Sequence, residues 1–83
     1  MSMPTDPRTY CSVDIAAHLT GLSSSRIRRL LRAGLVEPAV VVHGRPFFGQ
    51  TQLARLRKIR RLTDDLGVNL AGVEVILRLT GGA

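Results

Sequence analysis

Two short helical patterns separated by a single break constrain the fold of this chain more than any other feature. Ser12 can cap a first helix over about 13–19, in which apolar residues recur at the helical period. The Thr-Gly-Leu sequence at 20–22 breaks this pattern, and Ser23 can cap a second helix over about 24–33. Two short helices joined by a brief turn that contains glycine are typical of a helix-turn-helix.

The second half of the chain adds a hairpin and further helices. Around Gly44 a β-branched stretch is followed by an aromatic one, which predicts a short hairpin, or wing, over about 39–48. Helical periodicity returns over about 51–66, with Leu66 on the apolar side of the helix. Asn69 can cap a last helix.

A chain of 83 residues can bury one modest core, so these elements belong to one small domain. The predicted fold is mostly α, a winged helix-turn-helix with the order α-α-β-hairpin-α-α. We place it over 10–83, after a flexible arm at 1–9 that holds two prolines and few apolar residues.

The second helix carries four arginines within the seven positions 26–32. On a helical wheel its apolar residues gather on one side, and its basic residues spread over the other. A solvated helix usually mixes charges of both signs, but no acidic residue occurs between Asp14 and Glu37. Uncompensated guanidinium groups on one short helix indicate a polyanionic partner. A merely solvated basic face is the plainer alternative.

The total charge supports the same interpretation less specifically. Twelve basic and six acidic residues give a formal net charge of +6, which fits a nucleic-acid-binding protein. However, eleven of the twelve basic residues are arginine, and a GC-rich genome would also enrich this residue. The clustering of arginine in the second helix is therefore the more informative observation.

No pattern for catalysis, a cofactor or a metal is present. The single cysteine, Cys11, allows no internal disulfide, which fits a reducing, cytoplasmic setting. Asp14 and His18 lie one helical turn apart, but a metal site needs at least one more ligand nearby. No nucleophile with a recognisable base motif and no P-loop occurs, so we expect no enzyme. The apolar runs are too short for a membrane span, and no signal peptide is recognisable.

The stretch GLSSSRIRRLLRAGLVEP at 21–38 resembles the start of MerR-type transcriptional regulators. That family has Gly-Val-Ser, two variable residues, Thr-Leu-Arg-Tyr-Tyr-Glu, and then Gly-Leu and Pro. The resemblance continues through GRPFF in the wing and into QLARLRKIRRLTDDLGVNLAGVEVILRL, so that it covers about 10–79. The final part, LGVNLAGVEVIL, is similar both to the heat-shock repressor branch (HspR-like) and to the chaperone-modulator branch (CbpM-like).

The resemblance implies a MerR-like DNA-binding domain in which the helix at 24–33 enters the major groove of double-stranded DNA. The wing at 39–48 would then touch the flanking backbone. Arg28 matches the family's helix arginine that contacts DNA. The family's two tyrosines after this arginine are Arg29 and Leu30 here, so the phosphate contacts would be redistributed. We therefore expect a transcriptional regulator that associates with the nucleoid.

Combining the basic surface with the resemblance gives a set of candidate DNA-binding residues. Serines at the start of the second helix would contact oxygens of the DNA backbone, and its arginines would line the major groove. The wing would contact the DNA backbone that flanks this groove. Basic residues of the third helix would extend this surface. The set is Ser24, Ser25, Arg26, Arg28, Arg29, Arg32, His43, Arg45, Arg57, Lys58 and Arg61.

The last helix suggests a partner, because Val75 and Leu79 lie off its core stripe. MerR-type regulators usually dimerise through a long helix, and this chain stops at Ala83. A homodimer through the C-terminal helix, another protein partner, or the remainder of a longer chain would each cover the two side chains. They could also simply cap a thin core. The alternative function is a protein-interaction module of the chaperone-modulator kind, which binds a J-domain co-chaperone.

Overall fold

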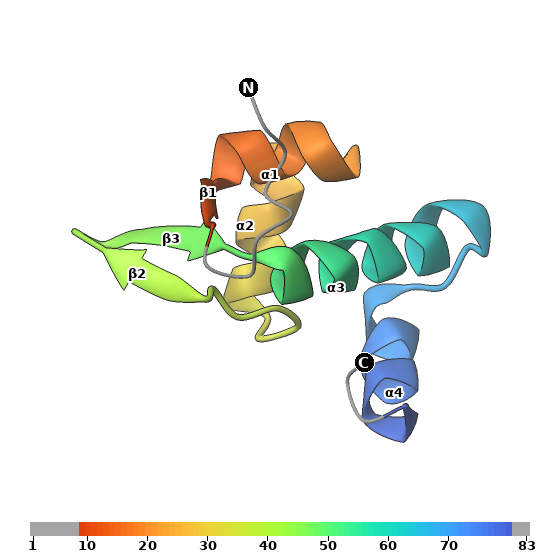
Figure 1. The fold of residues 1–83 in the computed structure, drawn as a ribbon. Coiled ribbons are helices and arrows are strands. Elements are labelled where there is room, and N and C mark those ends of the chain that lie inside the picture. Colours follow the sequence, from red (N-terminus) through yellow and green to blue (C-terminus); the bar gives the residue numbers. More distant parts are fainter. Residues whose placement is uncertain (1–8, 81–83) are drawn as a thin grey trace.

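The computed structural model describes residues 9–80, and it confirms the predicted class, since it has four α-helices and a small three-stranded sheet that lies at one side of the molecule (Figure 1). The elements are β1 (Cys11–Ser12), α1 (Val13–Thr20), α2 (Ser24–Arg32), β2 (Val40–Val42), β3 (Arg45–Phe48), α3 (Gln50–Arg60), the π-helical turn η1 (Arg61–Asp65) and α4 (Leu70–Leu79). The arm predicted at 1–9 lies outside the described residues, apart from Thr9.

The two predicted serine caps begin α1 and α2. Ser12 Oγ accepts a hydrogen bond from the backbone N–H of Ile15 at 3.4 Å, and Ser23 Oγ accepts one from Arg26 at 3.1 Å. Gly21 ends α1 in the left-handed region at φ 79°, which a glycine adopts without steric cost. The break between the helices is thus fixed by local hydrogen bonds and one glycine.

The wing is the hairpin of β2 and β3, joined by a two-residue turn. Both residues of that turn, His43 at φ 51° and Gly44 at φ 75°, have the positive φ values of a type I′ turn. A third strand, β1, is not among the elements predicted from the sequence; it pairs antiparallel with β3 so that Cys11 lies opposite Phe48. A two-residue strand is too short to show an alternating pattern. The strand order is β1-β3-β2, and β3 is therefore hydrogen-bonded on both sides.

The end of the third helix differs from the regular pattern that we expected over 51–66. Its last turn is π-helical, and the N–H of Leu66 donates to the carbonyl of Arg61 at 3.2 Å. The wider turn shifts the helical phase, so Leu66 leaves the apolar side and is 67% exposed. Ile15 is one of the apolar residues that recur at the helical period over 13–19, which would place it on the buried face, but its side chain is exposed on α1.

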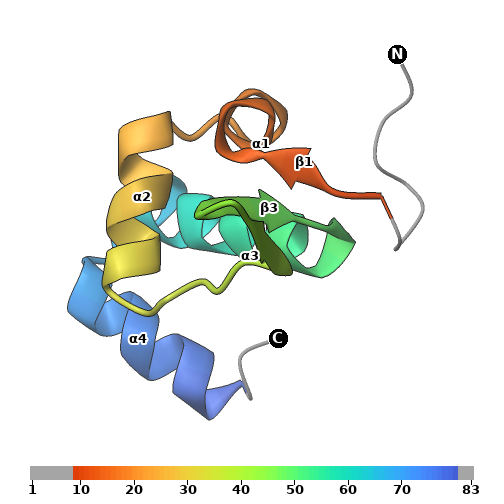
Figure 2. The same cartoon turned by 90° about the vertical axis from the view of Figure 1, so that its left-hand side faces the viewer.

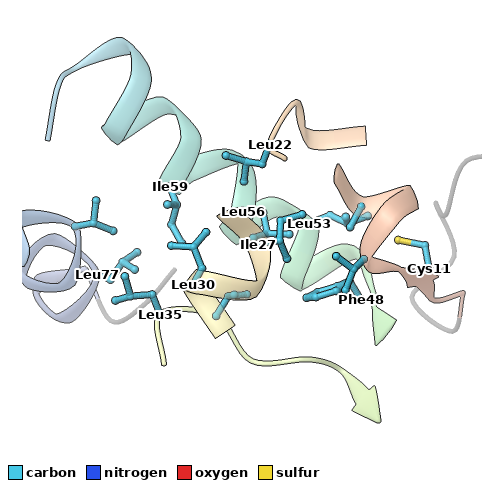
Figure 3. Packing of buried hydrophobic residues seen from close by; sticks show 14 residues of the cluster. Cys11, Leu22, Ile27, Leu30, Leu35, Phe48, Leu53, Leu56, Ile59 and Leu77 are labelled. Atoms are coloured by element: carbon cyan, nitrogen blue, oxygen red, sulfur yellow. The ribbon is translucent and has the colours of Figure 1, made fainter. Parts of the chain in front are cut away.

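One apolar core joins all the helices and the sheet. Figure 3 shows it extending from Cys11 and Phe48 at one end to Leu77 of α4 at the other. Ile27 and Leu30 attach the inner side of α2 to this core and are at most 3% exposed. The orientation of α2, and hence the direction in which its opposite side faces, is set by this packing.

Candidate nucleic-acid interface

The outer side of α2 presents basic side chains without internal partners. Arg28, Arg29 and Arg32 are exposed, while the apolar residues between them face the core. Within residues 9–80, none of these three guanidinium groups forms a hydrogen bond or an ion pair. Three like charges on a nine-residue helix repel one another, so an anionic ligand would stabilise this surface.

Arg26 differs from the other three arginines of α2. Its guanidinium lies 3.1 Å from a carboxylate oxygen of Asp64 and donates to Thr63 Oγ1 at 2.9 Å. The expectation that these arginines lack an acidic neighbour is therefore wrong for Arg26. The partners are 37 and 38 positions away in sequence, and only the packing of η1 against the start of α2 brings them together.

The electrostatics of Asp64 reflect this contact. Desolvation acts to raise its pKa, but hydrogen bonds from Thr63 and Arg26 and the positive charges of Arg26 and Arg60 together lower it. The net result is a pKa below the ordinary value for aspartate. The Nε atom of Arg60 lies 3.9 Å from the carboxylate, so Asp64 is shared between two arginines.

The serines at the start of α2 have different surroundings. Ser24 Oγ donates a hydrogen bond of 2.8 Å to Asp14 Oδ1, which ties α2 to the first turn of α1. Its hydroxyl hydrogen is therefore engaged inside the protein. Ser25 is exposed, and its Oγ lies 3.3 Å from that of the cap residue Ser23. Of the two predicted serines, Ser25 is the one that points into solvent.

A groove of about 400 Å³ is lined by residues of both the wing and α2. Figure 2 views the molecule from the side of the wing, with α1 above β3 and α2 beside it. The groove residues are Ser12, Val13, Asp14, Arg28, Gly44, Arg45, Pro46 and Phe47. Two predicted DNA-binding residues, Arg28 and Arg45, thus line one groove although 17 positions separate them in sequence. His43 is exposed at the tip of the wing.

The basic residues of α3 and η1 do not line this groove. Lys58 Nζ donates to Thr80 Oγ1 at 3.2 Å, which turns this side chain toward the end of α4. Arg57 and Arg61 are exposed. Arg55, which we did not single out, donates to the carbonyl of Leu35 at 2.6 Å and ties α3 to the loop after α2.

The side chains predicted to meet a partner on α4 are indeed exposed. Val75 is 55% exposed and Leu79 is 82% exposed, whereas Val73 and Leu77 on the same helix enter the core. The ion pair of Arg78 with Glu74, 2.7 Å long, lies along the same helix. An apolar strip beside a charged pair is a common surface for contact between helices.

The described residues hold no candidate metal site, and their one cysteine is buried. Residues 9–80 contain no cluster of three or more His, Cys, Asp or Glu side chains that could hold a metal ion. Cys11 is buried in the core, and burial raises the pKa of its thiol, as expected for a packing residue. None of the helices in this part of the chain has both the length and the apolar character needed to cross a membrane.

Comparison with known proteins places these features in a family. The family model described as "MerR HTH family regulatory protein" matches residues 12–81. A Streptomyces coelicolor protein with the provisional description heat shock protein HspR is 33% identical over 67 residues, which cover 81% of this chain and 44% of that protein. This chain therefore spans less than half the length of that relative. The description of the family model is that of a regulatory protein, and neither match favours the chaperone-modulator alternative.

Proposed function

This chain belongs to the MerR helix-turn-helix family of regulatory proteins, and we propose that it regulates transcription by sequence-selective binding to double-stranded DNA. The observation that carries this proposal is the exposed, internally unpaired guanidinium set of Arg28, Arg29 and Arg32 on α2. These groups lack counter-charges among residues 9–80, and phosphates would supply them.

In the proposed complex, α2 lies in the major groove, which is wide enough to admit a helix. Arginine can donate two parallel hydrogen bonds to the O6 and N7 atoms of guanine, so Arg28 and its neighbours can read bases as well as contact phosphates. Ser25 would reach the backbone near the helix N-terminus.

The wing extends the contact to one side of the major groove. Arg45 and His43 at its tip would hold phosphates of the flanking backbone. Arg57 and Arg61 would add long-range attraction, since they are exposed but lie outside the groove of Arg28 and Arg45. A protein with this function would reside on the chromosome.

We also propose that two copies associate through α4. Val75 and Leu79 would provide the apolar contact, and a two-fold dimer would present two copies of α2 to half-sites about one helical turn apart. If a different protein covers these side chains instead, the isolated chain will sediment as a monomer.

DNA binding is tested by fluorescence anisotropy with a labelled duplex at low and at high salt. Sedimentation of the free protein measures its oligomeric state. We expect affinity to fall as salt rises, with a log–log slope of about −0.9 for each phosphate contacted. Failure to bind any duplex at low salt, or an affinity independent of salt, would overturn the proposal.

A further inference from the structure

We propose that Asp14 is a specificity-determining residue of the DNA surface, because its carboxylate disfavours phosphate next to Arg28 and accepts a hydrogen bond from a cytosine amino group. This inference rests on the DNA-binding function proposed above. It adds an acidic residue to the basic and hydroxyl side chains of the proposed DNA surface.

The position of Asp14 is the first observation. It lies in the first turn of α1 and lines the groove together with Arg28 of α2 and Arg45 of the wing. The side chain is exposed, and within residues 9–80 it forms no ion pair with either arginine. The groove therefore combines two unpaired cations with one separate anion.

The second observation is that the carboxylate is oriented by the protein. Oδ1 of Asp14 accepts a hydrogen bond of 2.8 Å from the hydroxyl of Ser24, which leaves Oδ2 without a donor among the described residues. A carboxylate oxygen that is held in place and reachable from solvent can accept one further hydrogen bond from a ligand.

The mixed charge decides which part of DNA suits this groove. A phosphate beside Arg28 would be attracted by the guanidinium but repelled by the carboxylate of Asp14, whereas a base pair can satisfy both groups. In the major groove guanine presents two acceptors, which suit arginine, and its partner cytosine presents the N4 amino donor, which suits aspartate. Arg28 and Asp14 together therefore match a G·C pair.

The experiment is selection of binding sites from a random duplex library by the wild-type protein, Asp14→Ala and Asp14→Asn. For wild type we expect a cytosine preference at one position of the site. Asp14→Ala should weaken this preference at least about 5-fold and should raise affinity for non-specific duplex several-fold. Asp14→Asn retains an acceptor for Ser24 but lacks the charge, so it should raise non-specific affinity to a similar extent.

Asp65→Asn is the matched control, because Asp65 is exposed and lies outside the groove. It removes the same charge and should leave the selected sequence unchanged. Circular dichroism of each variant checks that the helices are intact. If Asp14→Ala selects the same bases as wild type, Asp14 acts only as a tether for Ser24 and the inference is overturned. If wild type selects no site and binds no duplex, the proposed function fails as well.

Discussion

The guanidinium of Arg26 lies 3.1 Å from the carboxylate of Asp64, so the first turn of α2 is joined directly to the π-helical turn at the end of α3. Thr63 supports the contact, since its Oγ1 accepts from Arg26 at 2.9 Å and also lies 2.9 Å from the carbonyl oxygen of Ile59. This connection divides the arginines of α2 into one that holds the helix in place and three that face outward.

Substitution of Arg28 and Arg26 should separate these two roles. We expect Arg28→Ala to reduce duplex affinity at least about 10-fold and to leave the thermal midpoint nearly unchanged, because its side chain contacts solvent. Arg26→Ala should lower the thermal midpoint and change affinity less. Anisotropy titrations and thermal melts of both variants provide the comparison, and equal affinity losses would contradict the division.

Acidification should weaken the contact between α2 and η1. The pKa of Asp64 is lowered in the folded state, so its contribution to stability is fully present above the ordinary pKa of 3.8 and is lost as the pH falls through the lower folded-state value. We expect the thermal midpoint of wild type to drop more steeply with acid than that of Asp64→Asn. Asp65→Asn, at the adjacent exposed position, is the control and should follow wild type.

A side chain at position 44, in the turn of the wing, should lower the stability of the folded protein. Its φ of 75° lies in the left-handed region, where a Cβ atom costs about 1–2 kcal/mol. Gly44→Ala should reduce the free energy of unfolding by about that amount, as measured by urea denaturation. Gly44→Asn should reduce the free energy of unfolding by less, since asparagine tolerates this conformation. An alanine variant as stable as wild type would argue against the type I′ turn.

Charge on the exposed strip of α4 should prevent self-association without unfolding the domain. Because Val75 and Leu79 lie outside the core, Val75→Asp and Leu79→Asp should retain the helical circular dichroism spectrum. Sedimentation should show dimers of wild type and monomers of both variants. Ala71→Asp, at another exposed position near the start of α4, tests whether added charge alone has this effect.

The thiol of Cys11 should react slowly in the native protein. Its side chain is 8% exposed and burial raises its pKa, so both access and the thiolate fraction are reduced. We expect the reaction with an aromatic disulfide reagent to be at least about 10-fold faster in denaturant than in buffer. Rapid native labelling would show that β1 opens readily.

Local signals in the sequence were sufficient for most of the helices. Ser12, Ser23 and Asn69 each cap the helix that they were expected to cap, because a cap depends only on residues within one turn. The strand β1 was missed because two residues carry no period. The π-helical turn was missed because nothing in the periodicity of 51–66 distinguishes it from an α-helical turn, and the position of Leu66 was wrong for the same reason.

The candidate site depended more on contacts between distant residues. The exposure of Arg28 followed from the alternation of basic and apolar residues along α2, which a helical wheel reveals. The pairing of Arg26 with Asp64 and the presence of Asp14 beside Arg28 and Arg45 could not be foreseen, since they depend on how α1, the wing and η1 pack around α2. Sequence patterns indicate which side of a helix is exposed, but not which side chains from other elements meet it.

The central position of β3 in the sheet has a mechanical consequence. This strand is hydrogen-bonded to β2 on one side and to β1 on the other, and β1 leads directly into α1. The base of the hairpin, at Phe47 and Phe48, is therefore anchored to the start of the first helix, which limits how far the spacing between the wing and Arg28 can change when a ligand binds. Restricted spacing of this kind reduces the entropy lost on association and disfavours ligands whose anionic groups are spaced differently.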